Sequence, residues 1–153
     1  MKHTLVRITA IAVVLFTLGS CAKKTTSTPS TPASTTPSFT ATMNGTATTF
    51  TGSASSGANY FQINGVNTST YTVELFLYKV SSTGTYSLAA NNGSDSYAVI
   101  SSQSGQSWTS TSGSVTISTY DATNKLVSGT FNITATGSGS MSVTSGSFAN
   151  ISF

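Results

Sequence analysis

The chain carries few side chains that could do chemistry. Its only histidine is His3 and its only cysteine is Cys21, both near the N-terminus. A Ser-His-Asp or Cys-His relay needs a base beside its nucleophile, and zinc or copper sites need imidazole or thiolate ligands. If a signal peptide is removed, as argued below, the mature chain has no histidine and no thiol available for catalysis. We therefore expect no catalytic residue, no bound metal and no cofactor.

Three carboxylates remain as candidates for acid–base chemistry: Glu74, Asp95 and Asp121. A glycosidase would need two of them facing each other, roughly 5–10 Å apart. Glu74 lies in the middle of a predicted strand, where an outward position beside a lysine is the simplest interpretation. Asp95 and Asp121 both fall in predicted turns, whose Asp side chains accept backbone N–H bonds. A calcium site built from Asp121 and Asn124 is the alternative, although one acid and one amide are few ligands. We expect the protein not to be an enzyme.

Trp108 stands out among the aromatic residues because its neighbours from Ser101 to Ser112 are serine, threonine, glutamine and glycine. A tryptophan in such a segment either caps an edge of the core or stacks on a sugar ring or a partner surface. The first interpretation is favoured, and the second makes Trp108 the candidate ligand-binding residue. The six tyrosines are interpreted as cross-strand packing residues rather than as a binding platform.

Cys21 ends a segment typical of a lipoprotein signal peptide. Lys2 and Arg7 give a positive start, and the apolar run from Ile8 to Leu18 follows. Eleven helical residues would span roughly 16 Å, about half of a ~30 Å hydrocarbon core, so the run is too short to cross a membrane. Leu18-Gly19-Ser20-Cys21 resembles the bacterial lipobox, whose cysteine is diacylglycerylated before cleavage and acylated afterwards. Several acyl chains on one residue would anchor the protein permanently.

An ordinary signal peptide is the alternative, but it would leave Cys21 as a free thiol. A lone cysteine cannot form an intramolecular disulfide, and a free thiol is unusual in an exported protein, so lipidation is favoured. Residue 22 is alanine, whereas an aspartate at this position would resemble an inner-membrane retention signal. Lys23-Lys24 lack the acidic cluster that resembles a surface-export signal. We expect an outer-membrane anchor facing the periplasm, with the cell surface as the alternative.

The segment after the cysteine has the composition of a linker. Residues 22–38 hold all three prolines and ten serines or threonines, and they contain no aromatic residue. They therefore cannot bury enough apolar area to fold. A flexible chain of this length reaches roughly 23 Å. We predict three parts: a signal peptide at residues 1–20, the lipidated Cys21 with its linker at 21–38, and an all-β domain at 39–153.

The predicted domain is almost uncharged. From Phe39 onward, Lys79 and Lys125 oppose the three carboxylates, a net charge of −1. This balance excludes the basic footprint of a nucleic-acid binder, so we expect no nucleic-acid partner. The six tyrosines and seven of the eight phenylalanines of the chain lie in this domain and supply enough apolar area for it to fold.

Alternating hydrophobicity from Phe39 onward predicts strands joined by short turns. Asn44-Gly45 between two alternating segments is the strongest short hairpin signal. Tyr60–Ile63 predicts a strand that ends in a second turn at Asn64-Gly65. Tyr71–Tyr78 is apolar on both parities except at Thr72 and Glu74, which predicts a central strand covered on most of both faces. Two further strands are expected at Gly84–Leu88 and Tyr97–Ile100, separated by the turn Asn91-Asn92-Gly93.

A near-repeat fills the C-terminal third. Ser112-Gly-Ser-Val115-Thr-Ile117, Ser128-Gly-Thr-Phe131-Asn-Ile133 and Ser145-Gly-Ser-Phe148-Ala-Asn-Ile151 follow one another at short, similar spacing. We predict three consecutive antiparallel strands, each opening at a glycine that permits a bulge or bend. Because no segment of helical period follows the signal region, the fold class expected is all-β: one antiparallel sandwich or flattened barrel of about eight to nine strands.

The runs "SFTATMNGTATTF", "GTYSL", "SGSVTISTYDATNKLVSGTFNITAT" and "VTSGSFANISF" cover most of residues 38–153. Together with the lipobox and linker, they resemble a family of uncharacterised small lipoproteins of the Bacteroidota. The resemblance implies a β-rich envelope domain and no particular activity.

Two functions are compatible with these observations. The first is a non-catalytic envelope lipoprotein whose β-domain is a binding or accessory module for a glycan or a neighbouring envelope protein. The second is a structural coat lipoprotein without a discrete ligand. A solvent-facing cluster of Trp108 with two or more tyrosines would favour binding, whereas a uniformly Ser/Thr surface would favour the coat.

Overall fold

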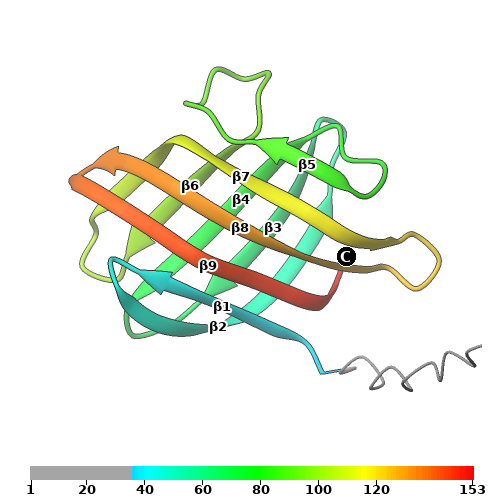
Figure 1. Cartoon of the computed structure of the whole chain (residues 1–153), viewed down its shortest axis with the longest axis horizontal. Helices are drawn as coiled ribbons and strands as arrows, with labels where there is room; N and C mark the ends of the chain where they lie inside the picture. Colours follow the sequence, from blue (N-terminus) through cyan, green and yellow to red (C-terminus); the bar gives the residue numbers. More distant parts are fainter. Residues whose placement is uncertain (1–35) are drawn as a thin grey trace, which may run out of the picture. The chain divides into compact units, whose positions relative to one another are not determined.

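The computed structural model describes residues 36–153, which form nine β-strands (Figure 1). They are β1 (Ser38–Met43), β2 (Thr46–Ser56), β3 (Tyr60–Val66), β4 (Tyr71–Tyr78), β5 (Gly84–Ser87), β6 (Tyr97–Ser102), β7 (Ser107–Asp121), β8 (Leu126–Gly137) and β9 (Gly139–Ser152). The signal peptide, Cys21 and most of the linker predicted from the sequence lie outside the described residues. Among the residues described, no helix is long and apolar enough to cross a membrane.

Eight of the strands close into an antiparallel barrel. Their order is β7-β6-β4-β3-β2-β1-β9-β8, and β8 pairs with β7 again to complete the circle. β5 is an extra strand that pairs only with β7. The expected all-β class and strand number are confirmed, and closure decides between the two predicted architectures in favour of the barrel.

The two Asn-Gly pairs behave differently. Asn44 and Gly45 have φ values of 45° and 88° and join β1 to β2 as predicted, since both central residues of this hairpin turn need positive φ. The predicted turn at Asn64-Gly65 is wrong, because both residues lie within β3 and pair with β2 and β4. Gly65 faces the interior, where an added Cβ would lie 2.5 Å from the Phe39 ring. This glycine therefore makes room for an aromatic ring.

The Ser-Gly repeats lie on consecutive antiparallel strands, as predicted, but inside them rather than at their openings. β7, β8 and β9 are longer than expected and run through all three repeats. Register shifts occur beside the repeats, and Ser145 has a φ of 49°. The bulge at Ser145 places both Val143 and Gly146 on the buried side of β9 although they have opposite parity. The glycines thus permit bulges, which is the part of the prediction that holds.

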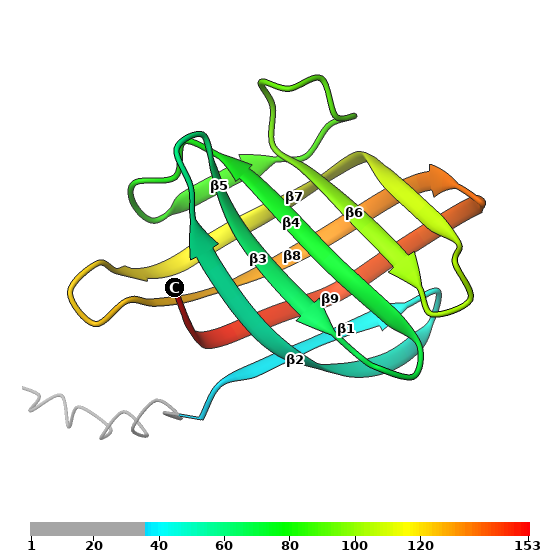
Figure 2. The same ribbon diagram turned by 180° about the vertical axis from the view of Figure 1, so that it is seen from behind.

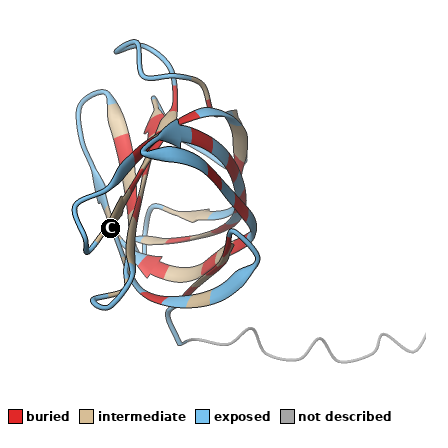
Figure 3. Cartoon of the chain, turned by 90° about the vertical axis from the view of Figure 1, so that its left-hand side faces the viewer, coloured by how far each residue is buried: buried red, intermediate tan, exposed pale blue. Residues whose placement is uncertain are grey.

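The barrel interior is filled by side chains. Buried and exposed positions alternate along the strands, as Figure 3 shows by colour. An eight-stranded barrel has an interior just wide enough for side chains to fill. Large residues exposed by less than 2% are contributed by strands from every side of the barrel: Phe39, Ile63, Leu75, Leu77, Ile100, Ile117, Ile133, Met141, Phe148 and Ile151.

A buried hydroxyl holds the barrel together where β6 and β7 separate. β7 pairs with β6 only at Ser107–Thr109 and pairs with β5 further along. At the divergence, the Ala98 N–H donates to Ser110 Oγ at 2.9 Å, and Ser110 Oγ donates to the Ala89 carbonyl at 2.7 Å. The Ser110 side chain thereby supplies a hydrogen bond between β6 and β7 at the point where their backbones no longer pair.

We expect Ser110→Ala to lower the free energy of unfolding by roughly 2–4 kcal/mol. The substitution leaves the Ala98 N–H and the Ala89 carbonyl without their partner, and each buried group left unpaired costs about 1–3 kcal/mol. Urea denaturation of the chain from residue 22 measures the loss. Ser107→Ala, an exposed position on the same strand, is the control and should change stability by less than ~0.5 kcal/mol. Equal stability of the two variants would contradict this role.

Candidate functional site

Trp108 does not lie in a loop. It belongs to β7, pairs with Ile100 of β6 and is 5% exposed. Its ring lies 6.2 Å from that of Tyr71, nearly edge to face. At 5% exposure the ring is part of the core, which agrees with the favoured interpretation that Trp108 caps an edge of the core and leaves no open ring face for the alternative, stacking on a ligand. Its polar neighbours belong to the same strand, in which Ser110, two residues on, is buried as well.

Cys21, the predicted lipidation site, lies outside the described residues, and its modification stays a prediction.

The three carboxylates lie in different places. Glu74 points outward from the middle of β4, as expected, and accepts a hydrogen bond from Gln62 rather than pairing with a lysine. Asp95 lies in the turn before β6, where its N–H donates to Asn92. Asp121 ends β7 at the hairpin to β8. Among residues 36–153, no group of three or more His, Cys, Asp or Glu side chains could hold a metal ion.

Asp121 is a turn-forming residue. Its carboxylate accepts bonds from the N–H groups of Asn124 and Thr123, each at 2.9 Å, and from the side-chain amide of Asn124 at 2.7 Å. These bonds, led by those from Asn124, lower the pKa of Asp121. Asn124 directs its amide nitrogen at Asp121, so the two side chains do not present a pair of oxygens to a calcium ion.

Four aromatic rings gather on the outer surface of β3, β4 and β6. These strands lie side by side on the face seen in Figure 2. Phe76 and Tyr97 stack with their centroids 4.6 Å apart and their planes 12° from parallel. Tyr60 lies edge to face against Phe76, Tyr78 and Tyr97 at 5.6–6.3 Å. All four rings are half-buried. We call this set (Tyr60, Phe76, Tyr78 and Tyr97) the aromatic cluster.

A groove of about 410 Å³ runs beside the aromatic cluster. Tyr60, Phe76 and Tyr97 supply its apolar side. The opposite side is the end of β2 and the turn into β3, residues 55–59, where the Ser55 side chain lies on the outer face like that of its pairing partner Gln62. No charged side chain lines the groove. Its two sides therefore differ in polarity, while its net charge is zero.

Gln62 also lines the groove, and two hydrogen bonds hold its side chain. Its amide nitrogen donates to Asn64 Oδ1 at 3.0 Å and to Glu74 Oε1 at 3.3 Å. These bonds fix the side chain with its amide nitrogen turned toward Asn64 and Glu74. Burial raises the pKa of Tyr97, and the neighbouring Tyr60 and Glu74 raise it further.

The aromatic cluster could not be recognised from the sequence. Its four members lie on three separate strands, and the register brings them together: Tyr60 pairs with Tyr78, and Phe76 pairs with Tyr97. A signal was present in the Tyr71–Tyr78 segment, whose apolar residues occupy both parities. One parity fills the barrel, and the other carries Phe76 and Tyr78 to the outside.

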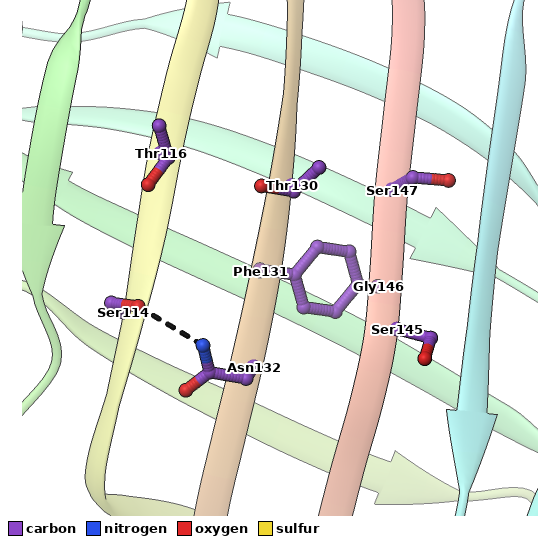
Figure 4. A pocket seen from close by; sticks show the side chains of 8 residues that line it. All are labelled: Ser114, Thr116, Thr130, Phe131, Asn132, Ser145, Gly146 and Ser147. Atoms are coloured by element: carbon purple, nitrogen blue, oxygen red, sulfur yellow. Dashed lines mark hydrogen bonds between the residues drawn. The ribbon is translucent and has the colours of Figure 1, made fainter.

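The barrel has a second distinctive surface, which is covered with hydroxyls. On β7, β8 and β9, a depression of about 350 Å³ is lined by small polar side chains around Gly146, above the Phe131 ring (Figure 4). The Asn132 amide donates to Ser114 Oγ at 3.0 Å across two of these strands. One row of paired residues bears hydroxyls on six neighbouring strands, β5, β7, β8, β9, β1 and β2: Thr85, Thr116, Thr130, Ser147, Thr40 and Thr49. We call the outer surface of β7, β8, β9, β1 and β2 the hydroxyl face.

The fold and these surfaces define a small closed β-barrel with a packed interior, whose distinctive chemistry lies on its outside. The chain belongs to the family described as a domain of unknown function, DUF6252, whose model matches residues 35–152. No curated protein and no solved structure is similar enough to this chain to count as a match.

Proposed function

We propose that the protein is a non-catalytic lipoprotein of the cell envelope, held at the outer membrane by lipid on Cys21, and that its barrel is a binding module. The groove beside the aromatic cluster is the binding site, and its ligand is a glycan or a neighbouring envelope protein. Glycan and protein surfaces both offer the combination of apolar and hydrogen-bonding groups that this groove matches. We assign no catalytic step, cofactor or nucleic-acid partner to it.

The single observation that carries this proposal is the position of the aromatic cluster. Four rings that could have filled the interior instead lie half-buried on the outer face of a barrel whose core is already complete. Aromatic rings are enriched at binding surfaces because they supply large, rigid contact area at small entropic cost. A groove with a polar opposite side lies directly beside them.

Site-specific photo-cross-linking in the intact envelope tests the proposal. A benzophenone amino acid at Ser53, exposed on the outer face of β2 two residues before the groove, places the probe beside the groove without filling it, and one at Thr130 places it on the hydroxyl face. We expect an adduct from Ser53 that disappears when Tyr97→Ala is added, and none from Thr130. An adduct pattern that is the same at both positions, or insensitive to Tyr97→Ala, would contradict a discrete site.

The coat function is the second candidate, because the hydroxyl face spans five strands and carries no charged side chain except Asp121 at the end of β7. A coat lipoprotein would pack against its neighbours through this surface. The same experiment separates the two functions, since a coat predicts adducts between copies of the chain from Thr130 and none that depends on Tyr97.

The proposed anchor gives a separate prediction. Cys21→Ser should abolish acylation and leave uncut precursor in the inner membrane, because the lipobox protease acts only on the modified cysteine. Labelling with an alkyne fatty acid and fractionation of the membranes measure both effects. As a control, Ser20→Ala keeps a small residue before the cysteine and should mature normally. A Cys21→Ser protein that is cut and still labelled would show that the anchor is placed wrongly.

A further inference from the structure

We infer that the groove beside the aromatic cluster binds neutral pyranose units of a glycan. This inference rests on the proposed binding function and narrows the ligand to one chemical class. The inference follows from the lining of the groove, which is apolar on one side, hydroxylated on the other and free of charged side chains.

A pyranose ring has the complementary construction. Its C–H bonds form an apolar face that stacks on aromatic rings, while its hydroxyls point outward around the rim. In the groove, Phe76 and Tyr97 supply a stacked aromatic pair on one side. Ser55 supplies a hydroxyl on the other side, where β2 pairs with the outward-facing Gln62 of β3, and Asn59 supplies an amide. A sugar lying between these sides would stack and hydrogen-bond at the same time.

The size and charge of the groove narrow the class further. A volume of about 410 Å³ is within the range of small-molecule sites, which run from about 300 to 1,000 Å³. A sulfated or uronic-acid polymer would need cations, and the two lysines of the described region, Lys79 and Lys125, do not line the groove. Glu74 is turned toward Gln62 and would repel an anion. The lining therefore favours an uncharged saccharide.

The hydroxyl of Tyr60 is a further observation in favour of a saccharide ligand. The Tyr60 hydroxyl is buried and has no hydrogen-bond partner among the residues described, although Tyr60 lines the groove. Buried polar groups without a partner are rare in native proteins and call for an explanation. A small rotation of the Tyr60 side chain toward the groove would let a sugar hydroxyl supply the missing partner.

The test is titration of the chain from residue 22 with neutral hexasaccharides of glucose, mannose, xylose and N-acetylglucosamine, followed by calorimetry or NMR shifts. We expect at least one of them to bind. Tyr97→Ala should weaken that binding at least about tenfold, equivalent to 1.4 kcal/mol, because it removes one of the two stacked rings. Tyr97→Phe keeps the ring and should stay within about threefold, or roughly 0.7 kcal/mol. Thr130→Ala, on the hydroxyl face, should bind like the wild type.

A second variant tests the groove without removing a packed side chain, so that a loss of binding cannot come from unfolding. Ser55→Ile changes an exposed residue on the polar side of the groove to one that strands favour. It removes no packing and fills part of the groove, so it should also lower the affinity about tenfold with unchanged thermal stability.

Three results would overturn the inference: no binding of any neutral hexasaccharide, binding that survives both Tyr97→Ala and Ser55→Ile, or equal loss in Thr130→Ala. Failure here is distinguishable from failure of the proposed function. If no saccharide binds but the Ser53 cross-linker captures an envelope protein in a Tyr97-dependent way, the saccharide inference is wrong and the binding function stands. If no saccharide binds and the cross-linker captures nothing, both are wrong.

Discussion

Phe131→Ala is expected to lower the free energy of unfolding by roughly 3–5 kcal/mol, as for other buried phenylalanines. The ring is 3% exposed and lies at the centre of an aromatic core, 5.3 Å from Phe39 and 6.3 Å from Phe148 between centroids. Its removal would leave a cavity that the closed barrel wall cannot collapse to fill. Denaturation by urea, monitored by β-type circular dichroism on the chain from residue 22, measures the change.

Gly146 provides a matched test of that interpretation. A Cβ at this glycine would lie 2.6–2.7 Å from three atoms of the Phe131 ring, so the ring rests directly on the β9 backbone (Figure 4). Gly146→Ala alone should cost roughly 1–3 kcal/mol through overpacking. In the Phe131→Ala background the same change should cost much less, because the space is empty. Additive losses in the double variant would show that the two residues do not share this space.

Trp108→Ala should also cost roughly 3–5 kcal/mol, because the side chain is 5% exposed and packs on Tyr71 at the end of the barrel. Thermal unfolding and hexasaccharide titration on the same preparation separate stability from binding. The folded fraction should bind as the wild type does, since Trp108 does not line the groove beside the aromatic cluster.

Trp108→Phe is the control for this effect. The indole N–H is buried without a hydrogen-bond partner among the residues described, so its removal loses no such bond. The variant keeps most of the apolar volume and should lose less than about 1.5 kcal/mol. A Trp108→Ala protein with unchanged stability and abolished binding would restore the ligand-stacking hypothesis for this residue.

Local pattern alone placed most of the strands. The Tyr71–Tyr78 segment and the Asn44-Gly45 hairpin were predicted where they occur, because a period of two and a positive-φ turn are properties of a few adjacent residues. The turn at Asn64-Gly65 was predicted wrongly for the same reason. Asparagine and glycine permit a turn there, but contact of Gly65 with Phe39, a residue from another strand, keeps the backbone extended.

The strand around Trp108 was not predicted from the sequence for a related reason. Serine and threonine are common in turns, yet here Ser107, Thr109 and Thr111 occupy outward positions of β7, while Trp108 faces inward opposite Ile100 of β6. Nothing within the segment reveals that pairing. The burial of Ser110 depends on where β6 and β7 separate, which is decided by the competition of β5 for the edge of β7.

The sequence by itself determined that this protein has an almost uncharged, strand-rich domain after residue 38, and that residues beyond Cys21 contain no histidine and no further cysteine. Only the tertiary structure decided that the strands close into a barrel, that Trp108 is buried and that Tyr60, Phe76, Tyr78 and Tyr97 meet on its outer face. Alternating hydrophobicity predicts which side chains share one face of a strand, and this pattern is the same in a sandwich and in a barrel. Which strands become neighbours, and in which register, depends on contacts between residues far apart in the chain, and the candidate site consists of such contacts.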